Sequence, residues 1–297
     1  MGILMWKTQL LMLLIWGASC SPREASIDNT TRFKEGKRLA ELDDSDMEEL
    51  SGLAASRSNP GLLWAHNDSG NAPEIFLIDT NLEIRQTFEL EGVENRDWED
   101  IAVGPGPDSG KFYLYIAEIG DNQAVYPFKH IYRIEEPSRQ KGKKKVQIKD
   151  FDVITFRLED GQKDAEALMI DPATRDLFLV SKREDPVYLY QLQYPYSTTD
   201  TLVARQVLSI PLTQIVAGDI SPDGKEVLLK NYDHIYYWDN SNGKTIPQLL
   251  EEPPKEVPYK VEPQGESIAW AENRSGFYTI SEQNKGKKTY LYFYKRR

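Results

Sequence analysis

A short motif recurs along the chain at intervals of about 50 residues, and this repeat constrains the fold more than any other feature. Each copy has a small or acidic residue, then Ile or Leu, then a turn. The copies are SGLAAS (51–56), EDIAVGP (99–105), EALMIDP (166–172), GDISPDG (218–224) and ESIAWAE (266–272). A regular period of this length indicates one supersecondary unit repeated in a stacked or circular array.

Each copy is followed by short segments rich in β-branched and aromatic residues, separated by Asn-Pro, Asp-Gly and Ser-Gly turns. Second strands are predicted at 62–67, 112–118, 177–182, 226–231 and 277–282. Third strands are predicted at 74–79, 129–135, 187–192, 234–239 and 289–294. Fourth strands are predicted at 84–90, 151–159 and 204–210, and more weakly at 244–250. Four antiparallel strands in each unit predict an all-β fold, a β-propeller with four-stranded blades.

The last unit has three strands before the chain stops, and its fourth strand is expected from the N-terminal segment 37–43. This pairing closes the ring and removes two exposed sheet edges. The count is five blades, and a six-blade alternative requires a further blade near 256–263. The basic segment 138–146 lies in the longest interval between copies and is expected to be a solvated hairpin loop.

Cys20 is the only cysteine, and it ends an N-terminal segment that is typical of a secretion signal. Residues 1–7 carry one positive charge, residues 10–16 are apolar, and residues 17–19 are small. A cysteine in this place resembles the bacterial lipobox, with Gly17 where Leu is common. The resemblance implies a lipoprotein signal peptide (1–19) and a lipidated Cys20. The polar segment that follows is expected to be a tether (20–32), and the repeat indicates a single β-propeller domain (33–297). An ordinary signal peptide or an uncleaved anchor is the alternative.

The expected location is the bacterial cell envelope, with the protein anchored by lipid to the outer membrane on its periplasmic or surface side. A lipidated Cys20 leaves no cysteine for a disulfide in the mature domain. The formal net charge of −11 argues against nucleic acid and against anionic membrane surfaces as partners of the molecule as a whole. With three histidines in the chain, a His-rich transition-metal site is not expected.

The innermost strands of a propeller line its central channel, so equivalent positions in successive blades converge on one axis. Two rings of polar side chains are therefore expected at one end of the channel. The first ring has Ser51, Glu99, Glu166, Gly218 and Glu266, two residues before each aligned aliphatic residue. The second ring has His66, Glu118, Lys182, Lys230 and Glu282, at the ends of the second strands. Asn67, Asp68, Asp121 and Asn122 lie close by in the sequence.

Converging carboxylates repel one another unless something neutralises them. Lys182 and Lys230 would do so in a buried ion-pair network. A hard divalent cation such as Ca²⁺ would do so by taking carboxylate, amide and backbone oxygens. A catalytic acid–base set is the third interpretation, in which His66 beside Asp68 acts as a base rather than as a hydrogen-bonded structural side chain. The sequence contains no GxSxG, HExxH or phosphate-binding glycine loop.

Several motifs resemble those of a group of bacterial secreted β-propeller proteins, mostly uncharacterised, over residues 48–284. They are HNDSG (66–70), DWEDIA (97–102), AEIGDN (117–122), DAEALMIDP (164–172), AGDISPDG (217–224) and GESIAW (265–270). The chain is more distantly similar to NHL-repeat, phytase-like and gluconolactonase-like propellers. The gluconolactonase-like enzymes use Glu, Asn and Asp of the channel as metal ligands, which implies Glu99, Asn67 and Asp121 here. The resemblance implies the fold but no single function, because propellers host many activities.

The resulting expectation is a membrane-anchored, extracytoplasmic β-propeller that binds a ligand or partner at the channel mouth without catalysis. The alternative is a metal-dependent hydrolase of the lactonase or phosphoesterase type that uses the carboxylate ring. A divalent cation such as Ca²⁺ is the one cofactor that the sequence suggests.

Overall fold

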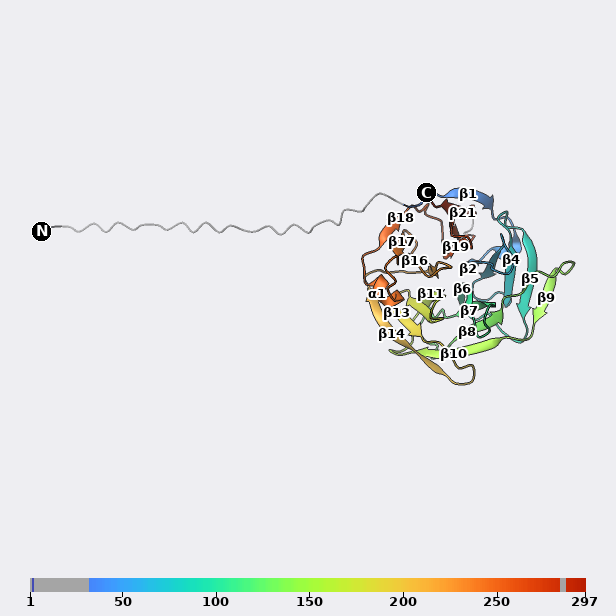
Figure 1. The fold of residues 1–297 in the computed structure, drawn as a ribbon, viewed down its shortest axis with the longest axis horizontal. Coiled ribbons are helices and arrows are strands. Elements are labelled where there is room, and N and C mark those ends of the chain that lie inside the picture. Colours follow the sequence, from blue (N-terminus) through green and yellow to red (C-terminus); the bar gives the residue numbers. More distant parts are fainter. Residues whose placement is uncertain (1, 3–31, 284–286) are drawn as a thin grey trace.

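The computed structural model describes residues 2, 32–283 and 287–297 (Figure 1). The predicted lipidation site Cys20 lies outside the described residues, as do the signal segment apart from Gly2 and the tether apart from Arg32. Within the described residues, no helix combines the length and the apolar character that a membrane crossing requires. All the sheets and the apolar core are formed by residues 33–297.

The fold is all-β and consists of several antiparallel sheets. One sheet contains β2 (Leu50–Ala55), β3 (Leu63–Asn67), β4 (Glu74–Ile78), β5 (Ile84–Leu90) and β9 (Lys145–Ile148). An eight-stranded sheet contains β6 (Trp98–Pro105), β7 (Phe112–Glu118), β8 (Lys129–Glu135), β10 (Asp152–Leu158), β11 (Ala165–Ile170), β12 (Leu177–Ser181), β13 (Val187–Leu192) and β14 (Leu202–Ile210). The other two contain β15 (Ala217–Ile220), β16 (Glu226–Lys230), β17 (Ile235–Asp239) and β18 (Lys255–Val257), and β19 (Ser267–Trp270), β20 (Gly276–Ile280), β21 (Tyr290–Lys295) and β1 (Lys37–Glu41).

The eight-stranded sheet is made of two antiparallel groups of four strands. Strands β6, β7, β8 and β10 form one group, and β11 to β14 form the other. The two groups join through a short parallel pairing of the outer strands β10 and β14, from Phe156–Leu202 to Leu158–Ala204. Apart from this junction and the addition of β9, every ladder among the described strands is antiparallel.

The first strand of each group lies at the centre of the molecule (Figure 1). Strands β2, β6, β11, β15 and β19 contact one another in a closed cycle. Side chains of these strands bond to the backbone of the next strand. These bonds run from Ser51 Oγ to the Glu99 carbonyl (2.7 Å), from the Leu168 amide to Asp100 (2.9 Å), from the Trp270 amide to Asp219 (2.7 Å) and from Ser267 Oγ to the Ser51 carbonyl (2.6 Å).

The apolar core lies between the faces of neighbouring sheets rather than at the centre of the ring. One cluster joins the sheet of β2–β5 to the group beginning with β6, with Trp64, Phe88 and Ile116 among its members. Another joins β15–β17 to β19–β21. Because each sheet is covered on both faces, β2 and β11 are buried along their whole length. The polar residues of these strands, such as Ser51 and Glu166, are therefore buried as well.

The two ends of the domain pair with each other, as the sequence predicts. Strand β1 lies antiparallel to β21, from Lys37 opposite Phe293 to Glu41 opposite Tyr290. Phe33 is fully buried and packs against the rings of three aromatic residues. These are Tyr237, Trp270 and Phe277, at ring-centre distances of 5.1–5.9 Å. The pairing thus covers what would otherwise be an open edge of β21.

The prediction of a strand at 244–250 is wrong. This segment forms the short helix α1 (Ile246–Leu250), and Thr245 and Gln248 make a capping box at its start. Pro247 fits the first turn of a helix, where its missing N–H is harmless, but it would interrupt a ladder. The fourth strand of this sheet is β18, which overlaps the segment that the six-blade alternative assigned to a separate blade.

The prediction of a solvated loop over 138–146 is wrong for the end of that segment. Residues from Lys145 onward form β9, which pairs in parallel with the edge strand β5. Lys145 bonds to Glu74 and Glu89 on that sheet, each at 2.5 Å. The residues before β9 project from the rim of the molecule (Figure 1). The composition of the segment indicated exposure correctly, but it gave no signal for this long-range pairing.

Candidate functional site

Carboxylates gather at the end of the ring where β6, β11 and β19 begin. The pairing of Trp98 with Glu118 and of Ala165 with Ser181 brings the starts of the inner strands beside the ends of the second strands. Two groups of three carboxylates share Glu99. We call these residues the Glu99 cluster, which comprises Asp68, Asp97, Glu99, Asp164 and Glu166.

Each trio of the Glu99 cluster is tight. In the first, one oxygen from each of Asp68, Asp97 and Glu99 lies within 4.8 Å of the others, and the same holds for Glu99, Asp164 and Glu166. Asp68 is partly exposed, whereas the other four are buried, with Glu99 only 5% exposed. The cluster therefore reaches solvent on the side of Asp68.

The local sequence explains why these side chains meet. Asp97 and Glu99 are two residues apart at the start of β6, and Asp164 and Glu166 repeat that spacing at β11. Residues i and i+2 of an extended chain point to the same side. Gly120 packs directly on this surface, because a Cβ there would overlap the Glu99 carboxylate and lie 2.5 Å from the Asp97 carboxyl carbon.

The second trio is neutralised by neighbouring cations. Lys182 forms a buried ion pair with Glu166, and Arg183 Nε lies 2.7 Å from Asp164 Oδ2. The amide of Asp121 donates a 2.8 Å hydrogen bond to the other oxygen of Asp164. Burial opposes the charged form of Lys182, but Glu166 outweighs it and raises the pKa of that ammonium. This arrangement matches the ion-pair interpretation for half of the cluster.

The first trio lacks such partners. Among the described residues, no Lys, Arg or His side chain forms an ion pair with Asp68, Asp97 or Glu99, and the Glu99 carboxylate accepts no hydrogen bond. Burial, followed by the charges of Glu166 and Asp68, raises the pKa of Glu99 well above its ordinary value. Burial raises the pKa of Asp68 to about 6 and also raises that of Asp97. Without a cation, this trio must take up protons.

Glu266 extends the acidic surface toward β19. Tyr232 donates a 2.6 Å hydrogen bond to Glu266, and the Glu266 charge raises the pKa of Glu166. Burial, followed by the Glu266 charge, raises the pKa of Glu282 to about 9. Lys230 is fully buried at this end, and burial lowers its pKa to about 8. It bonds to backbone carbonyls of Gly265 and Asn231, not to a carboxylate.

Other predicted site residues have structural contacts. His66 is fully buried, lies edge-on to Trp98 at 5.6 Å, and bonds to the Asn67 carbonyl at 3.0 Å. Burial lowers its pKa to about 4, so this ring stays neutral. Asn67 donates to the Asp46 carbonyl at 2.8 Å. Glu118 lies 3.4 Å from Arg96, outside the Glu99 cluster.

Of the set Glu99, Asn67 and Asp121, suggested by resemblance, Asp121 is not among the carboxylates that gather around Glu99. Both oxygens of Asp121 accept backbone amides, from Val125 and Tyr126 at 2.8 Å, and so hold the loop after β7. The exposed Asn122 accepts a hydrogen bond from Arg183. The sequence reasoning missed Asp97, Asp164 and Arg183. The repeated Asp-x-Glu spacing was the signal that would have found the two aspartates.

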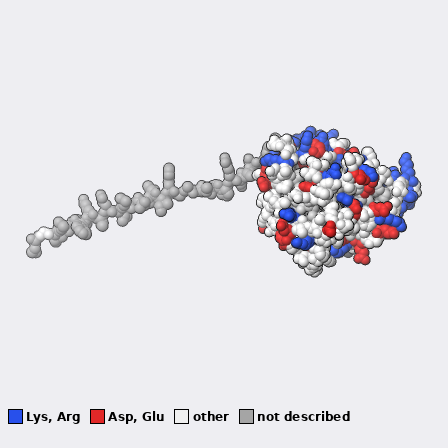
Figure 2. Space-filling view, turned by 60° about the horizontal axis from the view of Figure 1, so that its bottom comes forward, with Lys and Arg blue, Asp and Glu red and all other residues white. Residues whose placement is uncertain are grey.

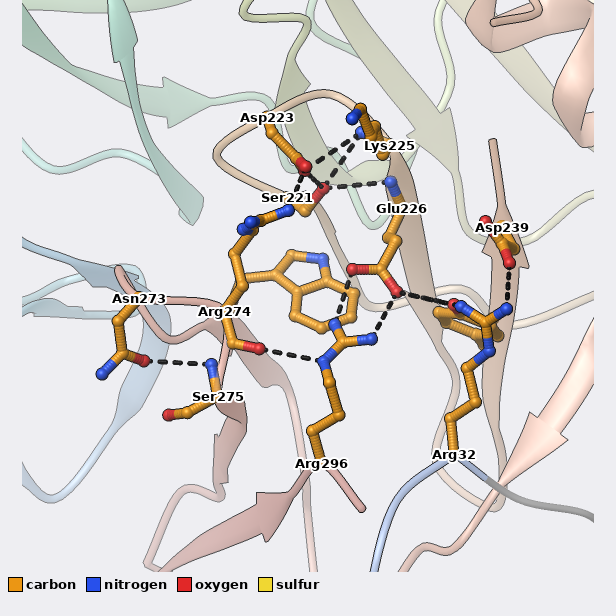
Figure 3. A network of polar contacts seen from close by, with 12 residues as sticks. Arg32, Ser221, Asp223, Lys225, Glu226, Asp239, Asn273, Arg274, Ser275 and Arg296 are labelled. Carbon is orange, nitrogen blue, oxygen red and sulfur yellow. Dashed lines mark hydrogen bonds and ion pairs between the residues drawn. The ribbon is translucent and has the colours of Figure 1, made fainter. Parts of the chain in front are cut away.

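A second polar network lies at the opposite end of the ring (Figure 3). Arg296 bonds to both oxygens of Glu226, at 2.8 and 2.5 Å, and Arg32 lies 2.5 Å from Asp239. Arg274 pairs with Asp223. Each of these arginines already has a carboxylate partner. The network therefore fastens both ends of the domain, at Arg32 and Arg296, to β16 and β17.

The chain matches no protein-family model and no curated protein sequence. The chemistry of the site therefore rests on its own geometry. The charges of Lys129 and Arg96 act on Asp97, but neither side chain forms an ion pair with it among the described residues. An all-oxygen donor set with three carboxylates that form no ion pair suits a hard cation such as Ca²⁺ better than a transition metal that prefers nitrogen or sulfur ligands.

Proposed function

We propose that the protein is a five-bladed β-propeller, anchored in the bacterial cell envelope through a lipidated Cys20, that binds a ligand at its channel mouth through a Ca²⁺ ion. The ion is held by Asp68, Asp97 and Glu99. The propeller interpretation is supported by the cycle of five inner strands and by the division of the eight-stranded sheet into two groups. Anchoring rests on the N-terminal sequence alone.

The observation that carries the proposed cation site is the contrast between the two trios. Lys182 and Arg183 neutralise Glu166 and Asp164, whereas the trio that opens to solvent has no ion pair within the described residues. Ca²⁺ takes six to eight oxygen ligands. Three carboxylates leave coordination positions for water or for oxygens of an external ligand. The centre thus fits a binding role in which the ion recognises hydroxyl or carboxylate groups of the ligand.

The test is a calorimetric titration of the metal-free protein with Ca²⁺. We expect one ion per chain in the parent, at least tenfold weaker binding in Glu99→Gln, and unchanged binding in Glu251→Gln, which removes an exposed carboxylate elsewhere. Thermal unfolding should follow the same order, because Ca²⁺ at 100 times its Kd stabilises the native state by about 2.7 kcal/mol. Equal titrations of the parent and Glu99→Gln would reject this site.

A metal-dependent hydrolase is the second candidate, and Asp68 is the observation that favours it. Asp68 is the solvent-facing member of the trio, so an ion held there is open to a substrate. Turnover of lactone or phosphodiester substrates by the Ca²⁺-loaded protein, lost when Ca²⁺ is removed and in Glu99→Gln, would support catalysis. The binding proposal predicts no turnover of either class.

A further inference from the structure

The loop before β9 carries positive charges that no acidic residue neutralises. Arg139, Lys141, Lys143 and Lys144 are exposed, and within the described part of the chain their side chains form no ion pair, hydrogen bond or ring contact. The two lysines that follow do pair, Lys145 with Glu74 and Glu89, and Lys149 with Glu91. We call residues 139–144 the basic loop. Figure 2 shows Lys and Arg gathered on a projection at the rim, where Figure 1 places this loop.

The backbone of the basic loop is fixed although its side chains are free. The buried side chain of Gln86 accepts the Gln140 amide at 2.7 Å and donates to the carbonyls of Gln140 and Lys143 at 3.0 and 2.8 Å. The amide of Arg139 bonds to Asn59 Oδ1 at 2.8 Å. Because the backbone of the loop is already fixed, binding through its side chains costs little backbone conformational entropy.

The basic loop begins at the end of the ring opposite the Glu99 cluster. It follows β8, and Glu136 at the end of that strand accepts hydrogen bonds from Ser56 and Ser58, in the turn that follows β2. The Glu99 cluster lies instead where the inner strands begin. The two groups of opposite charge are therefore separated along the axis of the ring.

The domain is also fastened to its N-terminal segment at this opposite end. Arg32 bonds to Asp239 at the end of β17, beside Arg296 and Glu226 (Figure 3). Cys20 lies 12 positions before Arg32, and 12 residues span at most roughly 40 Å. A lipid at Cys20 would thus keep this end of the ring close to the membrane.

We propose that the basic loop binds the headgroups of anionic phospholipids and turns the Glu99 cluster away from the membrane. Binding through the basic loop alone gives this orientation, and the proposed lipid anchor at the same end of the ring reinforces it. Lys and Arg near an anionic bilayer are attracted over about one Debye length, roughly 8 Å at physiological salt. The same surface potential repels the carboxylate end. A lipid chain together with a basic patch gives more stable attachment than one lipid chain alone.

The first experiment uses residues 21–297, which contain every strand that the structure describes and lack both Cys20 and the signal segment. Vesicles of phosphatidylcholine with 30% phosphatidylglycerol, and vesicles of phosphatidylcholine alone, are sedimented with the protein at low salt. We expect binding to the anionic vesicles only, and weaker binding as salt is raised. The triple variant Lys141→Gln, Lys143→Gln, Lys144→Gln should bind at least tenfold more weakly.

The matched control removes three exposed lysines elsewhere, in the variant Lys37→Gln, Lys255→Gln, Lys295→Gln. It should keep most of the binding. Equal losses in the two triple variants, binding to neutral vesicles, or a preference for duplex DNA over anionic vesicles would overturn the proposal. Because this protein carries no lipid and the assay contains no Ca²⁺, its outcome is independent of the anchor and of the cation site.

The second experiment measures orientation. Residues 21–297 contain no cysteine, so one can be introduced for a fluorophore, by Ser241→Cys beside β17 or by Gln123→Cys in the exposed loop after β7. On anionic vesicles with brominated lipid, the label at 241 should be quenched more strongly than the label at 123. Equal quenching, or the reverse order, would contradict the orientation.

Discussion

Lys182 and Glu166 form an ion pair in which both side chains are buried, with exposures of 9% and 3%. The pair closes one side of the Glu99 cluster, whereas no ion pair forms on the other side within the part of the chain that the structure describes. This asymmetry separates a structural half of the site from a half that is suited to binding a metal ion.

Replacing Lys182 with Met should strand a buried carboxylate. We expect a loss of roughly 3–5 kcal/mol in the free energy of unfolding, reduced to the extent that Glu166 takes up a proton. Chemical denaturation measures this loss. Lys288→Met is the control, because its pair with Glu41 is exposed to solvent and should contribute little to stability. Similar effects of the two changes would show that Glu166 does not depend on Lys182.

Closure of the ring by the N-terminal segment gives a second prediction. Phe33→Ala should reduce stability by about 3–5 kcal/mol, since this ring is fully buried among three aromatic side chains. Deletion of residues 33–45 should reduce stability further, because it also exposes the edge of β21. The exposed edge should promote aggregation. Melting curves and light scattering measure both effects. A deletion variant that melts like the parent would show that β1 is dispensable.

The sequence predicted the strands well because buried, repeated segments rich in β-branched and aromatic residues allow few alternatives. It also predicted that Glu99 and Glu166 would meet, since equivalent positions in a repeat converge. The helix at Ile246–Leu250 was missed although Thr245, Pro247 and Gln248 carried its capping signal. A short helix of this kind is indicated by its capping residues as well as by its apolar pattern.

The roles of Asp121 and Lys230 could not be predicted from the sequence. Asp121 looked like a ligand, but the loop after β7 folds back and saturates its oxygens with backbone amides. Lys230 looked like a partner for the carboxylates, but it donates to main-chain carbonyls. Both outcomes depend on loop conformations that no local pattern specifies. The repeat therefore predicted where Asp121 and Lys230 lie, but not which groups they contact.

His66 gives a prediction about pH. Its pKa falls from 6.5 in the unfolded chain to about 4 in the native state because the ring is buried. The unfolded state binds the extra proton, so this contribution to stability is present above pH 6.5 and is lost as the pH falls toward 4. Between pH 7 and pH 5 we expect a loss of about 2 kcal/mol from this residue.

The measurement for His66 is the difference in unfolding free energy between the parent and His66→Gln at pH 7 and at pH 5. The variant cannot take up this proton, so the stability gap between the two proteins should narrow by about 2 kcal/mol at the lower pH. A gap that does not change with pH would mean that His66 is not held neutral by burial.

The anchor is tested through Cys20. The change Cys20→Ser should release the protein from the membrane fraction or block its processing. Mass spectrometry of the parent should find an acylated cysteine at the mature N-terminus. An unmodified N-terminus at another residue would refute lipid anchoring, and it would leave the fold and the cation site untouched.

The most direct test of the cation centre is a crystal structure of the protein grown with Ca²⁺, with anomalous scattering used to locate the ion. The account predicts one ion at the channel mouth, with oxygens of Asp68, Asp97 and Glu99 at 2.3–2.6 Å from it. The ion should be absent from crystals of Glu99→Gln grown under the same conditions. Two results would contradict the proposed cation site. One is a channel mouth without an ion at saturating Ca²⁺, and the other is an ion held by Glu166 and Asp164 in place of Lys182 and Arg183.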